Sequence, residues 1–180
     1  GWFYEGAGIY RHVWLNQYQP VHLEENPVFV YSTIQKDIAA VFIETSVQNE
    51  SLSASAITVS AIITDRNGKI IGKTVEQPVS LSINEKKVIK QKLTVSKPRL
   101  WSLEDPYLYR VIPIVKANGK VIDTDNIRFG IRSINITNKG LFLNGQYIKI
   151  KGTNNHQDHA GVGSALPDYL QYYRIFLLKQ

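Results

Sequence analysis

The chain of 180 residues contains no cysteine and no methionine, and it has no long apolar run. Without cysteine there are no disulfide bonds or thiolate metal sites, so the fold depends on packing. No segment approaches the roughly 20 apolar residues of a membrane-spanning helix, which predicts a soluble chain with no membrane partner. Because even position 1 is glycine, we expect a piece excised from a longer protein.

Positive charge is in excess but scattered. The formal net charge is +6, yet the basic residues form no helical stripe and have no aromatic platform beside them. Lys90 and Lys92 alternate with Ile89, Gln91 and Leu93, which is typical of a strand with one solvated face. This pattern argues against a nucleic-acid partner.

Residues 9–137 predict an all-β domain. In the clearest segment, Ile57, Val59, Ala61 and Ile63 alternate with mainly polar neighbours, which is the period of a half-buried strand. About seven to nine such short strands with turn signals between them favour an antiparallel, immunoglobulin-like β-sandwich. The candidate segments from which these strands come are 9–16, 28–34, 39–48, 57–64, 70–71, 75–81, 86–96, 107–116, 120–123 and 126–136.

Asn-Gly pairs at 67–68, 118–119 and 144–145 predict three two-residue hairpin turns, because these residues accept the positive φ angles that such turns require. Pro113 falls inside a predicted strand and lacks an N–H donor. We therefore expect a sheet edge or a bulge at Pro113.

The loop 98–109 is rich in Pro, Trp and Tyr. Trp101 and Tyr107 could form an exposed platform that stacks on sugar rings. Alternatively, Trp101 could close one end of the sandwich, as large aromatic side chains usually do, and we favour this second interpretation.

The C-terminal region changes character. A strand pattern at 147–151 leads into the polar loop 152–159 and then into a helix that begins near Pro167 and Asp168. One βα unit cannot bury both of its apolar faces, so we interpret it as the opening unit of a truncated α/β domain. The helix carries two apolar stripes, Leu170, Tyr173 and Leu177 and also Tyr169, Tyr172 and Phe176. As a hypothesis, these stripes pack either on the sandwich of the same chain or on a second copy, which would give a homodimer.

The loop that precedes this helix holds His156, Asp158 and His159. A metal site is disfavoured because no further ligand cluster exists, and the glycine spacing fits no phosphate-binding loop. Two interpretations remain open. The loop is either a rim that binds sugar hydroxyls at the carboxyl end of a strand, or an ordinary polar surface loop.

Several motifs stand along the chain at 6–15, 100–109, 128–132, 142–145 and 151–156. In this order they resemble glycoside hydrolase family 2. Residues 6–15 resemble the exit from its N-terminal sugar-binding domain, and 100–109 resemble a loop of its central immunoglobulin-like domain. The segments 128–132, 142–145 and 151–156 are similar to the passage into its catalytic (β/α)8 barrel. Leu103 stands where the family pattern has proline.

The resemblance implies a retaining glycosidase with two catalytic glutamates about 5 Å apart. In the family both lie on later barrel strands, so no catalytic residue is expected up to Gln180. His156 would contact a hydroxyl of the terminal sugar, Asn154 would support the loop, and Asp158 and His159 are further substrate-binding candidates. No cofactor or metal is expected in this piece.

The loop sequence is most similar to bacterial β-galactosidases, and a β-glucuronidase or β-mannosidase parent is the alternative within the family. The bacterial compartment stays open between cytoplasm and periplasm. A non-enzymatic carbohydrate-binding or adhesion sandwich is the alternative from another class. The expected domains are the end of a linker (1–8), the sandwich (9–137) and the first βα unit of the barrel (138–180).

Overall fold

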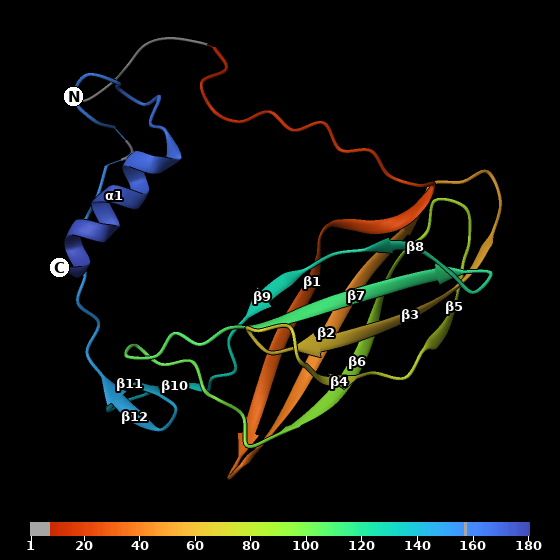
Figure 1. The fold of residues 1–180 in the computed structure, drawn as a ribbon, viewed down its shortest axis with the longest axis horizontal. Coiled ribbons are helices and arrows are strands. Elements are labelled where there is room, and N and C mark those ends of the chain that lie inside the picture. Colours follow the sequence, from red (N-terminus) through yellow and green to blue (C-terminus); the bar gives the residue numbers. More distant parts are fainter. Residues whose placement is uncertain (1–7, 157) are drawn as a thin grey trace. The chain divides into compact units, whose positions relative to one another are not determined.

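A computed structural model describes residues 8–156 and 158–180, and its regular elements are mostly short antiparallel strands (Figure 1). Part of the predicted linker (1–7) and Gln157 therefore lie outside the described residues. The strands are β1 (Val21–Gln35), β2 (Ile38–Asn49), β3 (Ser55–Thr64), β4 (Ile70–Lys73), β5 (Gln77–Leu81), β6 (Lys86–Ser96), β7 (Tyr109–Ala117), β8 (Lys120–Thr124), β9 (Ile127–Phe129), β10 (Ile134–Thr137), β11 (Gly140–Leu143) and β12 (Gln146–Ile148). One helix, α1 (Asp168–Lys179), follows them among the described residues.

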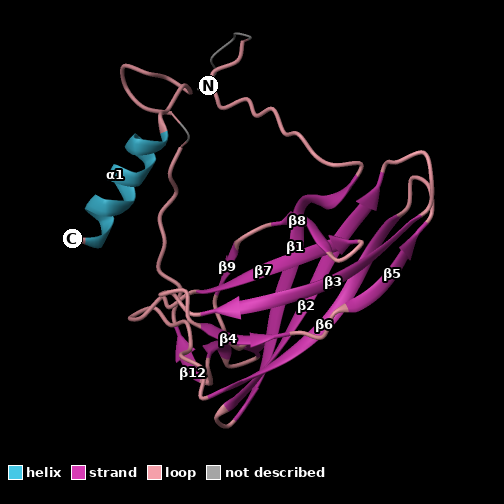
Figure 2. Ribbon diagram, turned by 45° about the vertical axis from the view of Figure 1, so that its right-hand side comes forward, coloured by secondary structure: helices cyan, strands magenta, loops and turns pink. Residues whose placement is uncertain are grey.

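Two antiparallel sheets make up the sandwich. The first has the order β1-β2-β6. The second has the order β4-β3-β7-β8, with β5 also paired to β3 and β9 to β7. The sheets face each other, as Figure 2 shows, and the predicted β-sandwich is confirmed.

Alternating side chains of both sheets meet in the interior. Along β2, every second residue is buried, as the period of two predicts. Val41 and Ile43 of this strand pack in one cluster with Ile63 of β3 and Val111 of β7, and all four have no exposed surface. Because each buried Val or Ile contributes about 1.5–3 kcal/mol, this interior is the main source of stability.

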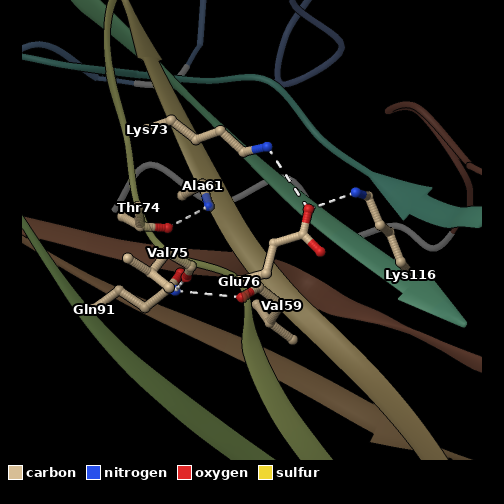
Figure 3. A network of polar contacts seen from close by, with 8 residues as sticks. All are labelled: Val59, Ala61, Lys73, Thr74, Val75, Glu76, Gln91 and Lys116. Atoms are coloured by element: carbon tan, nitrogen blue, oxygen red, sulfur yellow. Dashed lines mark hydrogen bonds and ion pairs between the residues drawn. The ribbon is translucent and has the colours of Figure 1, made fainter. Parts of the chain in front are cut away.

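Strands β4 and β5 pair with different parts of the same edge of β3, and residues 74–76 connect them (Figure 3). Thr74 fills the break between them: its Oγ1 accepts a hydrogen bond from the Ala61 N–H at 2.8 Å, and its N–H donates to the Ala61 carbonyl at 2.9 Å. Gln91 of β6 donates to the Val59 and Val75 carbonyls. This side chain therefore links the two sheets beside the break.

Two of the three predicted hairpin turns are confirmed. Asn118 and Gly119 both have positive φ angles (50° and 75°), and so do Asn144 and Gly145 (51° and 80°). The turn at 65–69 is different, because only Gly68 has a positive φ and the Asp65 N–H donates to the Lys69 carbonyl. Asp65 Oδ1 accepts hydrogen bonds from two N–H groups of this turn, which stabilises the longer loop.

Pro113 lies within β7, which is flanked by β3 on one side and by β8 and β9 on the other. The edge prediction is therefore wrong, and the pairing with β3 runs through Pro113 without a bulge. Pairing with β9 stops at Val111 and pairing with β8 begins at Ile114, so Pro113 occupies the gap between the two partners. Its carbonyl accepts a hydrogen bond from Thr124 Oγ1 at 2.8 Å.

Three predicted strands need correction. Residues 9–16 form no strand and are exposed. The segment 126–136 divides into β9 in the sandwich and β10 in a small separate sheet of order β10-β11-β12. The strand predicted at 147–151 is shorter, because β12 ends at Ile148 and pairs antiparallel with β11.

The chain has two compact units. One comprises Tyr18–Lys149 and holds every strand, and the other joins the described residues up to Gln17 with Ile150–Gln180. Helix α1 belongs to the second unit and has no buried residue. The domain boundaries inferred from the sequence stay predictions.

Candidate functional site

The polar loop before α1 is held by one arginine of that helix. Arg174 donates from Nη1 to the Asn155 side-chain oxygen at 3.3 Å and to the His156 carbonyl at 3.1 Å. Its Nη2 donates to the Asp158 carbonyl at 2.6 Å. The positions of His156 and Asp158 are thus set through their backbone carbonyls.

His159 lies at the start of a tight turn. Its backbone exchanges two hydrogen bonds with Gly163, and Gly161 and Gly163 have positive φ angles of 87° and 56°. Its Nδ1 donates to the Ala160 carbonyl at 2.9 Å, because a carbonyl can only accept. This contact turns the His159 ring toward its own turn.

The structure thus places His156, Asp158 and His159 on one short segment, with Arg174 in direct contact with its backbone. Asn154, His156 and His159 are exposed, and Asp158 is half-buried. Such a segment can offer imidazole, amide and carboxylate groups to a polar ligand. In residues 8–156 and 158–180, no three His, Cys, Asp or Glu side chains are grouped as metal ligands.

The start of α1 carries an exposed ion-pair cluster within the same unit. Asp168 contacts Arg11 Nη2 at 3.2 Å and His12 Nε2 at 2.9 Å. The hydrogen bond from His12 is the main reason that the pKa of Asp168 lies below its usual value. Arg11 Nη1 also donates to the Leu166 carbonyl, so the pair attaches the N-terminal segment to the first turn of the helix.

The aromatic residues of loop 98–109 are mostly packed. Tyr107 is 8% exposed and contacts the ring of Tyr109 edge-on. Trp101 is half-buried, with the guanidinium of Arg132 4.9 Å from its ring and its side chain against Gly130. This arrangement favours the closing role over a sugar-stacking platform made of Trp101 and Tyr107.

Exposed aromatic rings occur elsewhere, on the outer face of the β1-β2-β6 sheet. Tyr31 stacks on its cross-strand partner Phe42 at 4.9 Å between ring centroids, and Phe29 lies 5.6 Å from Tyr31. The Lys92 ammonium lies 5.4 Å from the Phe42 ring. Sequence reasoning missed this aromatic strip, although the i, i+2 spacing of Phe29 and Tyr31 placed both on one face.

Four glutamates of the sandwich, Glu24, Glu44, Glu76 and Glu85, form surface ion pairs with lysines. Glu76 contacts Lys116 Nζ at 2.5 Å and Lys73 Nζ at 3.7 Å (Figure 3). The hydrogen bond from Lys116 is the main reason that the pKa of Glu76 is lowered. The pKa of Glu85 is lowered chiefly because the Ser82 N–H donates to its carboxylate. Both groups therefore favour the ionised form.

The model of the family "Glycosyl hydrolases family 2" matches residues 21–132, which is the span from β1 to the end of the sandwich. The chain belongs to glycosyl hydrolase family 2. This membership agrees with the resemblance of the sequence motifs, and it accounts for the sandwich of the Tyr18–Lys149 unit.

The relatives of this family 2 chain include proteins named as β-galactosidases and proteins named as β-glucuronidases. It is 32% identical to "Beta-galactosidase BoGH2A" of Bacteroides ovatus over 91% of its own length and 19% of the relative's. It is 30% identical to a "Beta-glucuronidase" of Formosa agariphila, covering 99% of this chain and 19% of that one. A solved family 2 member from Bacteroides cellulosilyticus superimposes with a TM-score of 0.83 and 32% identity, covering 90% of this chain and 22% of that one.

The family 2 chain thus spans about a fifth of the length of the curated relatives it matches. Its one described helix, α1, has 12 residues and is too short to cross a membrane.

The site residue that sequence reasoning missed is Arg174, which contacts the loop before α1. Its signal was an arginine within an otherwise mainly apolar helix pattern.

Proposed function

We propose that this chain is the central scaffold and the first barrel segment of a retaining family 2 β-glycosidase, most specifically a β-galactosidase. The observation that carries the proposal is the family match over the sandwich, in a chain that spans 19% of its relatives. The parent hydrolyses a terminal β-linked sugar, and this piece alone does not. Its sandwich holds the neighbouring domains of the parent at a fixed spacing.

The charge states of two sandwich glutamates, Glu76 and Glu85, support this division of labour. A retaining mechanism needs one carboxyl group with a raised pKa to act as general acid. Glu76 and Glu85 have lowered pKa values instead, because ammonium and N–H donors favour their ionised forms. Their environment suits surface ion pairs, and the catalytic pair belongs on the later barrel strands of the parent.

The loop 154–159 is the part of this piece that contacts substrate. His156 binds a hydroxyl of the terminal sugar, Asn154 supports the loop, and Asp158 and His159 complete the polar rim. Arg174 supports the proposal because its three hydrogen bonds hold this loop in place. In the full-length parent, His156→Ala should raise KM for the galactoside more than about tenfold, the equivalent of one lost hydrogen bond to a buried ligand.

The direct test compares the 180-residue chain with the full-length parent on 4-nitrophenyl β-galactoside and 4-nitrophenyl β-glucuronide. We expect turnover of the galactoside by the parent and none by the chain. Hydrolysis by the purified chain would refute the scaffold assignment. Preferential hydrolysis of the glucuronide by the parent would favour the β-glucuronidase alternative, which the name of the Formosa agariphila relative supports.

A carbohydrate-binding sandwich without an enzymatic parent is the second candidate. The aromatic strip of Phe29, Tyr31 and Phe42 favours it, because exposed rings stack on the apolar faces of sugars. Binding of neutral β-glycans by this chain that is lost in Phe42→Ala, together with a parent inactive on both glycosides, would establish that candidate.

A further inference from the structure

Three arginines surround one hollow of the Tyr18–Lys149 unit. Arg66 comes from the loop between β3 and β4, Arg110 from β7 and Arg128 from β9. The cavity volume is about 360 Å³, and the segment 105–108, Asp105 included, completes its lining. We call this feature the arginine hollow.

Two of these arginines oppose each other directly. Arg110 and Arg128 are Cα partners in the antiparallel pair of β7 and β9, so their side chains stand on the same face of the sheet. Like charges in this position destabilise a sheet. Arg110 Nη1 donates only a long hydrogen bond, 3.4 Å, to the neutral Asn126 side chain. Within the described part of the chain, the Arg128 side chain makes no hydrogen bond or ion pair.

The acids near the hollow are occupied by other groups. Asp105, which also lines it, accepts a 2.6 Å hydrogen bond from Arg99 Nε. Asp65 accepts the N–H groups of Asn67 and Lys69 in its own turn, and Asp125 accepts the N–H of Asn126. The three guanidinium groups therefore lack an anionic partner within the described residues.

One wall of the hollow is fixed by packing. The guanidinium groups of Arg66 and Arg99 lie over the Tyr107 ring, with their Cζ atoms 5.8 Å and 4.5 Å from the ring centroid. The Tyr107 hydroxyl accepts a hydrogen bond from the Arg66 N–H at 3.4 Å. Because Tyr107 is 8% exposed, these contacts attach Arg66 to the core of the sandwich.

We propose that the arginine hollow binds the oxyanion group of an acidic saccharide, either a uronate carboxylate or a sulfate ester. The planar guanidinium matches both groups through paired N–H donors, and the charge of the anion relieves the repulsion between Arg110 and Arg128. The volume is in the range of small-ligand pockets, whereas a protein partner would need a contact area of about 800 Å² on each side. The site uses none of residues 154–159, so its test is independent of hydrolysis by the parent.

The test is a nuclear magnetic resonance titration of the ¹⁵N-labelled chain at low salt. The probes are methyl β-D-glucuronide, glucose 6-sulfate, neutral methyl β-D-glucoside, inorganic sulfate and a hexaglutamate peptide. We expect saturable shifts of the Arg66, Arg110 and Arg128 signals with one or both acidic saccharides, and none with the neutral glycoside. Shifts with the glucuronide alone assign a carboxylate site, and shifts with the sulfated sugar alone assign a sulfate site.

Variants separate this site from a general effect of positive charge. Arg128→Gln should weaken saccharide binding at least about tenfold, as expected for a lost charge-assisted hydrogen-bond pair. Lys120→Gln removes the same charge from the exposed start of β8 and should change affinity less than twofold. Arg110→Gln is the second test variant. Without ligand, both arginine variants should melt at a higher temperature than the wild type, because the repulsion is gone.

Several outcomes would overturn the proposal. These are equal binding of the neutral glycoside, inorganic sulfate binding as tightly as the saccharides, binding of hexaglutamate alone, or no saturable shift. Equal weakening by Lys120→Gln and Arg128→Gln would also contradict it, because the effect would then come from net charge.

Discussion

At the scale of single residues, Tyr109 is the group through which alkaline pH should weaken the sandwich. It is 5% exposed, and its hydroxyl accepts the Arg99 N–H at 2.8 Å. Burial raises its pKa above the usual 10.0, because the charged phenolate is poorly solvated there. The folded state therefore holds the proton more tightly than the unfolded state. Its stabilising effect is complete below pH 10 and is lost as the pH rises through the folded-state pKa.

We predict that Tyr109→Phe lowers the free energy of unfolding by about 1–3 kcal/mol at neutral pH, because the Arg99 N–H loses its acceptor. Urea unfolding followed by fluorescence measures this change. The difference from the wild type should narrow above pH 10, since only the wild type carries this ionisable group. Tyr31→Phe, on the exposed sheet face, is the control, with a change within about 0.5 kcal/mol. A difference that stays constant across alkaline pH would contradict the titration argument.

Gly130 tests how tightly Trp101 closes its end of the sandwich. A Cβ added at Gly130 would lie 2.8 Å from the Trp101 Cβ, well inside van der Waals contact. Gly130→Ala should therefore cost about 1–3 kcal/mol by overpacking, measured by thermal and urea unfolding. Gly152→Ala, where a Cβ meets no atom within 4 Å, should leave the unfolding of the sandwich unchanged. Equal stabilities of the two variants would show that Trp101 moves freely.

At the scale of elements, local sequence patterns predicted those strands that pair with the next strand along the chain. Asn118-Gly119 and Asn144-Gly145 carry their own turn chemistry, so their hairpins follow from two residues each. Residues 9–16 are also rich in the β-branched and aromatic residues that favour strands, but among the described residues they pair with no strand, and Ile9 is 84% exposed. The composition of one segment cannot reveal whether a free sheet edge exists to receive it.

The same limit applied to the candidate site. The spacing of Asn154, His156 and Asp158 identified the loop, because their polar groups follow a strand pattern directly. Two of the three Arg174 hydrogen bonds go to backbone carbonyls 16 and 18 positions away, and every residue has such a carbonyl. The third goes to the side chain of Asn155. The arginine hollow likewise depends on the register of β7 with β9, and no sequence motif records that register.

Arg174 should determine the order of the loop before α1. Arg174→Ala removes three hydrogen bonds and keeps the helix, because alanine is the best helix former. We expect amide hydrogen exchange of residues 155–159 to rise about tenfold, which corresponds to one charge-assisted hydrogen bond. Lys179→Ala, in the last turn of the same helix, is the matched control and should leave this exchange unchanged. Equal exchange in both variants would mean that the turn at Gly161 and Gly163 orders the loop without Arg174.

At the scale of the whole molecule, the two units differ in how they bury apolar surface. The Tyr18–Lys149 unit encloses two apolar clusters between its sheets. Helix α1 has no buried residue, although most of its side chains are large and apolar. A helix that is apolar over much of its circumference is stable in water only when other chain covers it. In the proposed parent the rest of the barrel provides that cover.

The separate chain should therefore self-associate through α1. Phe176 and Leu177 are 46% and 49% exposed, and with Tyr173 they form an apolar surface that a second copy can cover. Light scattering after size exclusion should give a mass that rises toward that of a dimer as concentration increases. The double variant Phe176→Ser with Leu177→Ser should stay monomeric. Ile136→Ser, an equally apolar exposed position on β10, should behave as the wild type. A wild-type chain that is monomeric at every concentration would exclude the dimer and leave α1 uncovered until the barrel is complete.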